Sequence, residues 1–207
     1  MKEFSIPGEL LGEVVLSEND IRTAEERLAE RIMVDFAGQV PVIMCVKEGA
    51  KYFFDDLCAL LDASKFNYEK AWIVTSSYYG NTSSGNVRVG SYEGPSVKYR
   101  NVIVVEDVID TALTMKRLMQ HMADEGAQGV DACALLFKKR PQNLIWRIFG
   151  LRAGLGMPHI RYTGAYIPNQ FVVGKGLDYD GYGRAGTEVR VLPPAGQAWV
   201  DAQKGKG

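Results

Sequence analysis

Residues 101–115, with the sequence NVIVVEDVIDTALTM, contain the residue types needed to bind a sugar phosphate. A short run of branched aliphatic residues, typical of a strand buried on both faces of a parallel sheet, ends at two adjacent acids, Glu106 and Asp107. Open α/β sheets bind their ligands beyond the carboxyl ends of such strands. The next turn is small and hydroxyl-rich, and the helix expected after it begins with free N–H groups that favour a phosphate. We therefore expect the acids to hold sugar hydroxyls and the turn to hold a phosphate.

A second turn of the same kind lies upstream. Lys47, Glu48, Gly49 and Ala50 follow the apolar run VPVIMCV and precede another expected helix. A glycine at this point permits a close approach of the backbone to a ligand. One such turn is weak evidence, whereas two in one sheet suggest two phosphate subsites around one ligand.

Strands and helices alternate along the chain in a way that predicts a doubly wound, mainly parallel α/β sheet. We expect strands at 40–46, 72–76, 102–105 and 132–137, and helices at 21–36, 49–61 and 111–124. Ser17 is the expected N-cap of the first helix and Gly38 its stop. We expect one domain over 1–207, with a core at about 38–140 and a small hood built from about 1–16 and 158–195. Residues 78–94 read as a long loop, and a long loop in a compact domain is usually functional.

Composition excludes several classes of function. The chain has 24 Lys and Arg residues against 25 Asp and Glu, which argues against a nucleic acid or a membrane surface as the main partner. Cys45, Cys58 and Cys133 lie among apolar neighbours without metal or redox spacing, as expected of buried free thiols in a reducing compartment. No run is long enough to span a membrane and the first residues lack a secretory apolar region, so we expect a cytoplasmic protein.

Four segments, in order, resemble the type I phosphoribosyltransferases, specifically the hypoxanthine-guanine phosphoribosyltransferase family. VIVVEDVIDTALTM resembles the family's phosphoribosyl diphosphate signature, and SSYYGNTSSGNVRV resembles its mobile loop. LLFKKRP resembles the strand with the purine-recognising lysine, and IPNQFVVGKGLDYDGYGR resembles the purine pocket and metal-binding segment. The likeness covers about 40–184 and implies the type I fold and transfer of phosphoribosyl from phosphoribosyl diphosphate to N9 of hypoxanthine or guanine.

The resemblance implies roles for the sugar-binding and phosphate-binding segments. Glu106 and Asp107 are expected to hold the ribose 2- and 3-hydroxyls, with a metal ion nearby. Backbone amides and hydroxyls of the following turn are expected to surround the 5-phosphate: Asp110, Thr111, Ala112, Leu113 and Thr114. Further substrate contacts are expected from Lys47, Gly49, Ser77, Tyr78 and Val108.

The resemblance also implies how the purine is recognised. Asp110 is expected near purine N7 as the general base. Lys138 is expected to donate to the oxygen on carbon 6, which would explain a preference for 6-oxopurines over adenine because an ammonium has donors only. Phe171 is expected to stack on the base, and the backbone of Val172 to read its edge.

The remaining implied roles concern charge and solvent. Asp178 is expected to bind Mg²⁺, with Glu106 and Asp107 as further metal ligands, and Arg184 to approach the departing diphosphate. Mg²⁺ and an arginine can offset the negative charge that builds on the leaving group. An exposed oxocarbenium ion would be trapped by water, so the 78–94 loop is the expected lid.

The chain departs from the family pattern in three places. Ala112 stands where the signature usually has glycine, so its backbone must avoid a positive φ or tolerate mild strain. Glu48 replaces a lysine of the diphosphate loop, and we favour recognition by backbone amides there, with Lys47 as the nearby cation. Residues 144–162 match the family poorly.

Two alternatives stay open. The same fold could use xanthine or uracil as the acceptor, since the pair Lys138–Lys139 makes a more anionic base conceivable. A regulator that senses phosphoribosyl diphosphate without efficient turnover is the second alternative, and Glu48 is the feature that favours it. The resemblance further implies a homodimer or homotetramer.

Overall fold

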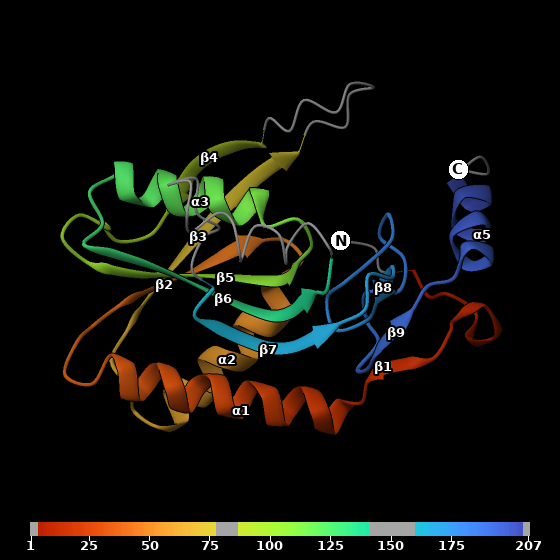
Figure 1. Cartoon of the computed structure of the whole chain (residues 1–207), viewed down its shortest axis with the longest axis horizontal. Coiled ribbons are helices and arrows are strands. Elements are labelled where there is room, and N and C mark those ends of the chain that lie inside the picture. Colours follow the sequence, from red (N-terminus) through yellow and green to blue (C-terminus); the bar gives the residue numbers. More distant parts are fainter. Residues whose placement is uncertain (1–3, 78–86, 141–159, 205–207) are drawn as a thin grey trace.

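A six-stranded sheet forms the centre of the computed structural model, which describes residues 4–77, 87–140 and 160–204 (Figure 1). The strand order is β4-β3-β2-β5-β6-β7, and every neighbouring pair is parallel except β3–β4. The predicted doubly wound, mainly parallel sheet is thereby confirmed. The strands are β2 (Val42–Lys47), β3 (Glu69–Ser77), β4 (Val87–Glu93), β5 (Asn101–Ile109), β6 (Gly129–Lys138) and β7 (Tyr162–Ile167).

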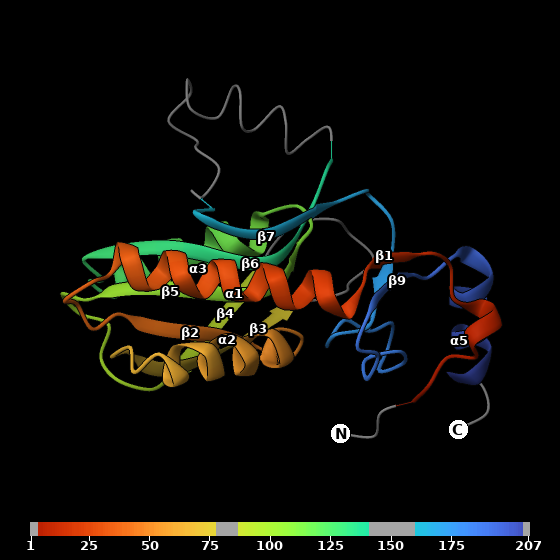
Figure 2. The same cartoon turned by 90° about the horizontal axis from the view of Figure 1, so that it is seen from below.

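Helices cover both faces of this sheet. Helices α1 (Glu18–Asp35) and α2 (Lys51–Ala63) pack on one face, and α3 (Leu113–Asp124) packs on the other (Figures 1 and 2). Residues of β2 alternate between the two layers: Ile43 and Cys45 join the α1–α2 side, while Val42 and Met44 join the α3 side. This two-sided burial explains why the strand reads as a continuous apolar run.

The start of α1 and the state of the cysteines match the sequence expectations. The Ser17 side chain accepts a hydrogen bond from the Asp20 backbone N–H at 3.2 Å, and the Asp20 carboxylate accepts one from the Ser17 N–H at 3.1 Å. This reciprocal capping box satisfies two amides that would otherwise lack partners. All three cysteines are buried and free.

Most element boundaries differ from the prediction by a few residues, and two of these differences lie at the candidate site. Strand β5 continues to Ile109, so Glu106 and Asp107 lie inside the strand rather than after it, because pairing with β6 continues past them. Helix α3 begins at Leu113 instead of Thr111, because Ala112 has a left-handed backbone (φ 60°, ψ 1°) that cannot continue a helix.

The predicted 78–94 loop is wrong in part. Residues Val87–Glu93 form β4, which pairs antiparallel with β3 at the edge of the sheet. Strand β4 carries Gly90 and Ser91 among its apolar residues, and its composition therefore hid the strand. Residues 78–86 lie outside the described part of the chain.

A second, three-stranded sheet lies beside the carboxyl ends of the main strands (Figure 2). It has the order β1-β9-β8, and it is preceded by the short helix η1 and followed by α5. Ile6, Val173, Leu192 and Val200 form its own small apolar cluster. The division into a core and a hood stays a prediction. The bounds are η1 (Gly8–Leu10), β1 (Val14–Leu16), β8 (Val172–Val173), β9 (Val189–Val191) and α5 (Pro194–Lys204).

Within the described ranges, the helices are all too short or too polar to cross a membrane.

The left-handed backbone of Ala112 gives a stability prediction. An L-residue in this conformation costs about 1–2 kcal/mol, which glycine avoids. Ala59 is an exposed helical alanine in α2, where a glycine should cost about 1 kcal/mol. We expect the unfolding free energy of Ala112→Gly, measured in urea, to exceed that of Ala59→Gly by about 1 kcal/mol or more. Equal losses in the two variants would show that the position carries no strain.

Candidate active site

The carboxyl ends of three neighbouring strands bring the predicted site residues to one edge of the sheet. Lys47 ends β2, Asp110 follows β5 and Lys138 ends β6. Strands β2, β5 and β6 lie side by side and parallel, so these ends point the same way. The site predicted from strand ends is therefore assembled from adjacent elements, as open α/β sheets require.

Glu106 and Asp107 form an enclosed acid pair near the end of β5. Burial, reinforced by the charge of Asp107, raises the pKa of Glu106 to about 8. Burial raises the pKa of Asp107 to about 6, against the hydrogen bond that Asp107 Oδ1 accepts from the Val108 N–H at 2.7 Å. Neighbouring charges act on Asp107 in both directions, with Arg184 lowering the pKa and Asp178 raising it. A donor of hydroxyl hydrogen bonds or a cation would stabilise these carboxylates in their charged form.

The turn after the acid pair leaves the start of α3 open. Ala112 is the N-cap residue, and no side chain caps the helix there. Thr111 and Leu113 are exposed, and Thr114 follows in the first turn of the helix. The free N–H groups and the helix dipole at this end suit a phosphate.

Asp110 is held between two cations. Lys138 Nζ lies 3.2 Å from Asp110 Oδ2, and the guanidinium of Arg140 pairs with Asp110 Oδ1. Lys138 is buried, only 7% exposed, and its Nζ lies 5.6 Å from the centre of the Phe171 ring. Phe171 is half-exposed just before β8, and Val172 begins that strand. An acid, a lysine and an aromatic ring thus converge where a flat, hydrogen-bonding ligand could bind.

Arg140 was not predicted as a site residue. The sequence reasoning considered the neighbouring Lys139 instead, but the structure leaves Lys139 exposed. The Lys139 backbone N–H still donates to the Ile167 carbonyl at 2.8 Å, so the extended path continues beyond β6. Alternation along that path puts Lys138 and Arg140 on one side and Lys139 on the other. This period of two is the signal that could have identified Arg140.

A cavity of about 480 Å³ is lined in part by Arg184, the residue whose charge lowers the pKa of Asp107. Arg184 is buried, 8% exposed, and it pairs with Asp178, while its Nη1 has no hydrogen-bond partner among the described residues. The unpartnered donor and the nearby lysines favour an anion. The lining residues are Cys45, Lys47, Glu48, Lys51, Tyr52, Asp55, Trp72 and Arg184.

Two of the four residues of the predicted diphosphate turn, Lys47 and Glu48, line this cavity. Lys47 pairs with Glu93 at 3.1 Å, and Glu48 is exposed after a cis Lys47–Glu48 peptide bond. Ala50, the N-cap of α2, makes no side-chain cap hydrogen bond with any described residue, and the first amide of the helix, that of Lys51, donates to the Glu48 carbonyl at 3.3 Å. Lys51, which the sequence analysis did not select, also lines the cavity and adds a cation.

Gly49 lies so close to Asp107 that there is no room for a side chain at this position. A Cβ built on Gly49 would lie 2.2 Å from Asp107 Oδ2. The turn after β2 is therefore in direct contact with the acid pair on β5. The glycine that the sequence analysis took as allowing close approach to a ligand also allows close approach to Asp107.

The acids suit a magnesium ion that a substrate carries. Among residues whose positions are described, no cluster of three or more His, Cys, Asp or Glu side chains is arranged to enclose a metal. Mg²⁺ is usually held by one or two carboxylates together with substrate phosphates and waters. The enclosed carboxylates of Glu106 and Asp107, with Asp178 acting electrostatically on Asp107, match such a partial donor set.

Two segments named in the sequence analysis lie partly outside the described residues. Ser77 ends β3, and Tyr78 lies outside the described residues, as does most of the 144–162 segment.

Comparison with known proteins identifies the family to which this chain belongs. A family sequence model described as a phosphoribosyl transferase domain matches residues 16–148. The hypoxanthine-guanine phosphoribosyltransferase of Sus scrofa is 31% identical, over 94% of this chain and 88% of the relative. That of Streptococcus thermophilus is 34% identical, over 81% of this chain and 85% of the relative.

Further relatives widen the substrate range and support the fold. The hypoxanthine-guanine-xanthine phosphoribosyltransferase of Tritrichomonas foetus is 31% identical, over 82% of this chain and 85% of the relative. The structure of a hypoxanthine phosphoribosyltransferase variant from Trypanosoma cruzi with the product IMP has a TM-score of 0.77 and 29% identity, covering 96% of this chain and 97% of that chain. The chain belongs to the phosphoribosyltransferases, and within them to the hypoxanthine-guanine phosphoribosyltransferase family.

Gly49→Ala tests the contact between the two turns. The added methyl must displace the Asp107 carboxylate, which then loses its hydrogen bond from Val108, so we expect a loss of about 1 kcal/mol in unfolding free energy. If Asp107 holds the donor's sugar, the KM for phosphoribosyl diphosphate should rise by about tenfold or more. Gly8→Ala is the control, because no atom of the described residues lies within 4 Å of a Cβ there. An unchanged KM in Gly49→Ala would remove Asp107 from sugar binding.

Proposed function

We propose that this protein is a purine salvage enzyme that transfers 5-phosphoribosyl from phosphoribosyl diphosphate to N9 of hypoxanthine or guanine. The products are IMP or GMP and diphosphate. The observation that carries the proposal is the grouping of Asp110, Lys138 and Phe171 beside the acid pair of β5. This grouping offers a proton acceptor, a donor and a stacking face for a 6-oxopurine.

The donor's sugar phosphate would bind along β5 and the start of α3. The Glu106 and Asp107 carboxylates would accept hydrogen bonds from the ribose 2- and 3-hydroxyls. The uncapped amides at Leu113 and Thr114, with the Thr111 hydroxyl, would hold the 5-phosphate. The distance between sugar and phosphate sites is then set by one strand and its turn.

The base would bind at the Asp110 end. Lys138 Nζ would donate to the oxygen on carbon 6, and the Phe171 ring would stack on the purine with Val172 reading its edge. Asp110 would take the proton from N7 as the N9 lone pair forms the bond to ribose carbon 1. The bond from carbon 1 to diphosphate breaks at the same centre, and its electrons leave with the diphosphate.

The negative charge on the leaving diphosphate would be neutralised by cations at the 480 Å³ cavity. Arg184 would offer a buried donor there, and Lys47 and Lys51 also line the cavity. Mg²⁺, held by Asp178 with Glu106 and Asp107, would neutralise part of the diphosphate charge. Backbone recognition at the Gly49 turn leaves room for the exposed Glu48 side chain to point elsewhere.

Xanthine is the second candidate acceptor. Arg140 adds a cation next to Lys138, which favours a more anionic base, and the Tritrichomonas foetus relative includes xanthine in its name. The grouping of Asp110 with Lys138 and Phe171 favours an enzyme over a regulator that only senses phosphoribosyl diphosphate, because a sensor needs neither a base nor a purine clamp. A cytoplasmic location and a homodimer or homotetramer complete the proposal.

The proposal is tested by nucleotide formation from hypoxanthine, guanine, xanthine, adenine and uracil, each with phosphoribosyl diphosphate and Mg²⁺. We expect turnover of hypoxanthine and guanine, and little of adenine or uracil. Turnover of none of the five bases would refute the enzyme assignment. Turnover of uracil alone would refute the purine assignment.

Lys138→Gln should weaken discrimination between purines. A charge-assisted hydrogen bond contributes about 1.5–3 kcal/mol, so kcat/KM for hypoxanthine should fall by about 10- to 100-fold. Gln can accept as well as donate a hydrogen bond, so the ratio of hypoxanthine to adenine turnover should fall as well. Lys139→Gln, at the exposed neighbour, is the matched control and should leave the ratio unchanged.

Asp110→Asn tests the base. The amide cannot accept the N7 proton, so kcat should fall by about 10²- to 10⁴-fold. Binding of phosphoribosyl diphosphate, measured by calorimetry with Mg²⁺, should change much less. An equal loss of binding and turnover would contradict the role of Asp110 as the general base.

A further inference from the structure

Lys175 lies in the loop between β8 and Asp178, and it connects that loop to two helices of the main domain. We propose that Lys175 is a positioning residue that holds this loop against the Gly49 turn and so sets the geometry of the diphosphate site. The inference rests on the proposed function, since it concerns how the same site binds its phosphoribosyl donor.

The Lys175 ammonium lies between two carboxylates from different helices. Its Nζ is 3.1 Å from Glu25 Oε1 of α1 and donates a hydrogen bond to Asp56 Oδ2 of α2. The Lys175 side chain is 16% exposed and that of Glu25 only 6%, whereas Asp56 is 50% exposed. A buried ion pair of this kind loses much when one partner is removed, because the other charge is left unpaired.

The charges of the trio depend on one another. Burial raises the pKa of Glu25, and the charge of Lys175 acts in the opposite direction. Burial lowers the pKa of Lys175, but the hydrogen bond to Asp56 and the charge of Glu25 outweigh that effect, so its pKa is raised overall. The three side chains therefore keep Lys175 charged and attached to both helices.

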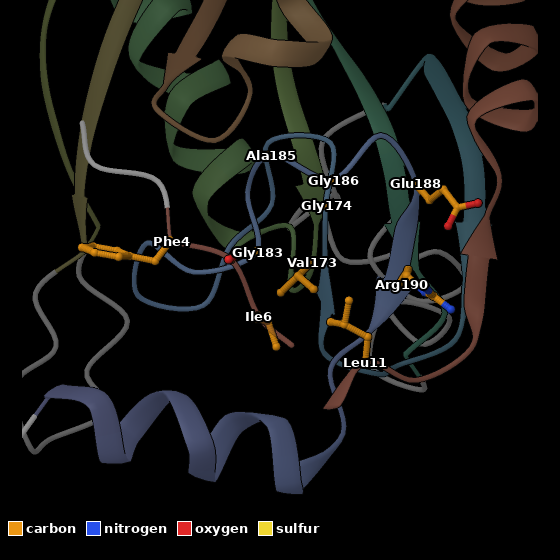
Figure 3. A pocket seen from close by; sticks show the side chains of 11 residues that line it. Phe4, Ile6, Leu11, Val173, Gly174, Gly183, Ala185, Gly186, Glu188 and Arg190 are labelled. Carbon is orange, nitrogen blue, oxygen red and sulfur yellow. The ribbon is translucent and has the colours of Figure 1, made fainter. Parts of the chain in front are cut away.

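The backbone at Lys175 is one that few lysines adopt. Its φ is 52°, between Gly174 at 101° and Gly176 at 93°. The Lys175 N–H donates to the Gly186 carbonyl at 2.6 Å, and the Gly176 N–H donates to the Arg184 carbonyl at 3.0 Å. Figure 3 shows Gly174 and Gly186 next to each other in these facing segments. A left-handed conformation at a non-glycine residue persists only where its surroundings fix it.

The residue after Lys175 touches the candidate diphosphate turn. A Cβ on Gly176 would lie 2.7 Å from the Gly49 carbonyl oxygen and 3.1 Å from Tyr52 Cδ2. Gly49 in turn lies against Asp107, as described above. A movement of Lys175 is therefore passed by direct contact to Gly49 and the acid pair.

The loop leads to the Arg184 pair in the other direction. Asp178 follows Lys175 by three residues and pairs with Arg184, whose carbonyl accepts from Gly176. The positions of Arg184 and of the Gly49 turn, the two groups proposed to bind the diphosphate, thus both depend on the position of the 174–178 loop. At the purine end, the contacts of Lys138 with Asp110 and Phe171 involve none of the side chains Glu25, Lys175 and Asp56. Loss of the Glu25–Lys175–Asp56 contacts should accordingly affect the donor more than the base.

Lys175→Met removes the charge and keeps the aliphatic stem. We expect the KM and the calorimetric Kd for phosphoribosyl diphosphate with Mg²⁺ to rise by about tenfold, with less than a twofold change in the KM for hypoxanthine. Lys175→Arg should restore the donor's KM to within about threefold of the unmodified protein. Lys70→Met, which removes the surface pair with Asp62, is the matched control and should leave all constants unchanged.

Asp56→Asn supplies a second variant that keeps the fold, because Asp56 is half-exposed. We expect a smaller rise in the KM for the donor, and the double variant with Lys175→Met should be no weaker than Lys175→Met alone. A purely structural role would lower the active fraction, so Vmax would fall while the KM and Kd for the donor stayed constant. That result would overturn the positioning role. A rise in the donor's KM in the double variant equal to the product of the rises in the two single variants would overturn it as well. Failure of the unmodified protein to bind phosphoribosyl diphosphate would instead refute the proposed function itself.

Discussion

Two glycines lie where there is no room for a Cβ, and the geometry of the candidate site depends on these two close contacts. Gly49 lies against the Asp107 carboxylate, and Gly176 lies against the Gly49 carbonyl. The first contact joins the turn after β2 to β5, and the second joins the small-sheet side of the chain to both. Protein interiors transmit such displacements because they are close-packed. The positions of Asp107, the Gly49 turn and the 174–178 loop are therefore coupled by contact.

The buried charged groups of the same region would be stabilised by a bound ligand. Two adjacent carboxylates on β5 are enclosed, and burial raises the pKa of both. Arg184 has a buried nitrogen that makes no hydrogen bond with any residue the structure describes. Burying each of these groups without a partner costs folding free energy. Hydroxyls or a cation would stabilise the carboxylates, and a phosphate would stabilise the arginine. A site that is strained in this way without its ligand is a common compromise between stability and activity.

Much of the scaffold could be predicted from sequence because its signals are local. The branched run before Glu106, the capping box at Ser17 and the apolar face of α3 each identify an element by themselves. Strand β4 escaped prediction because glycine and serine interrupt its pattern, and its pairing with β3 is a property of the sheet. The left-handed Ala112 shifted the start of α3 for a reason that the residue type does not show.

The site residues divide in the same way. The motif residues on strand ends came together as expected, since parallel strands bring their carboxyl ends to one edge. Arg140, Lys51 and Lys175 were not selected, because their importance comes from contacts with residues far away in the chain. Arg140 alone had a usable signal, the alternation with Lys138. The Glu25–Lys175–Asp56 trio joins three elements, and no single stretch of sequence indicates it.

The most direct test of the account is a crystal structure of the protein with IMP bound. We expect the purine on the Phe171 ring, with its oxygen about 3 Å from Lys138 Nζ, and the ribose hydroxyls at the same distance from Glu106 and Asp107. The phosphate should lie on the amides at the start of α3. An IMP whose ribose does not touch Glu106 or Asp107, or that binds in the 340 Å³ cavity beneath the small sheet (Figure 3), would contradict the account.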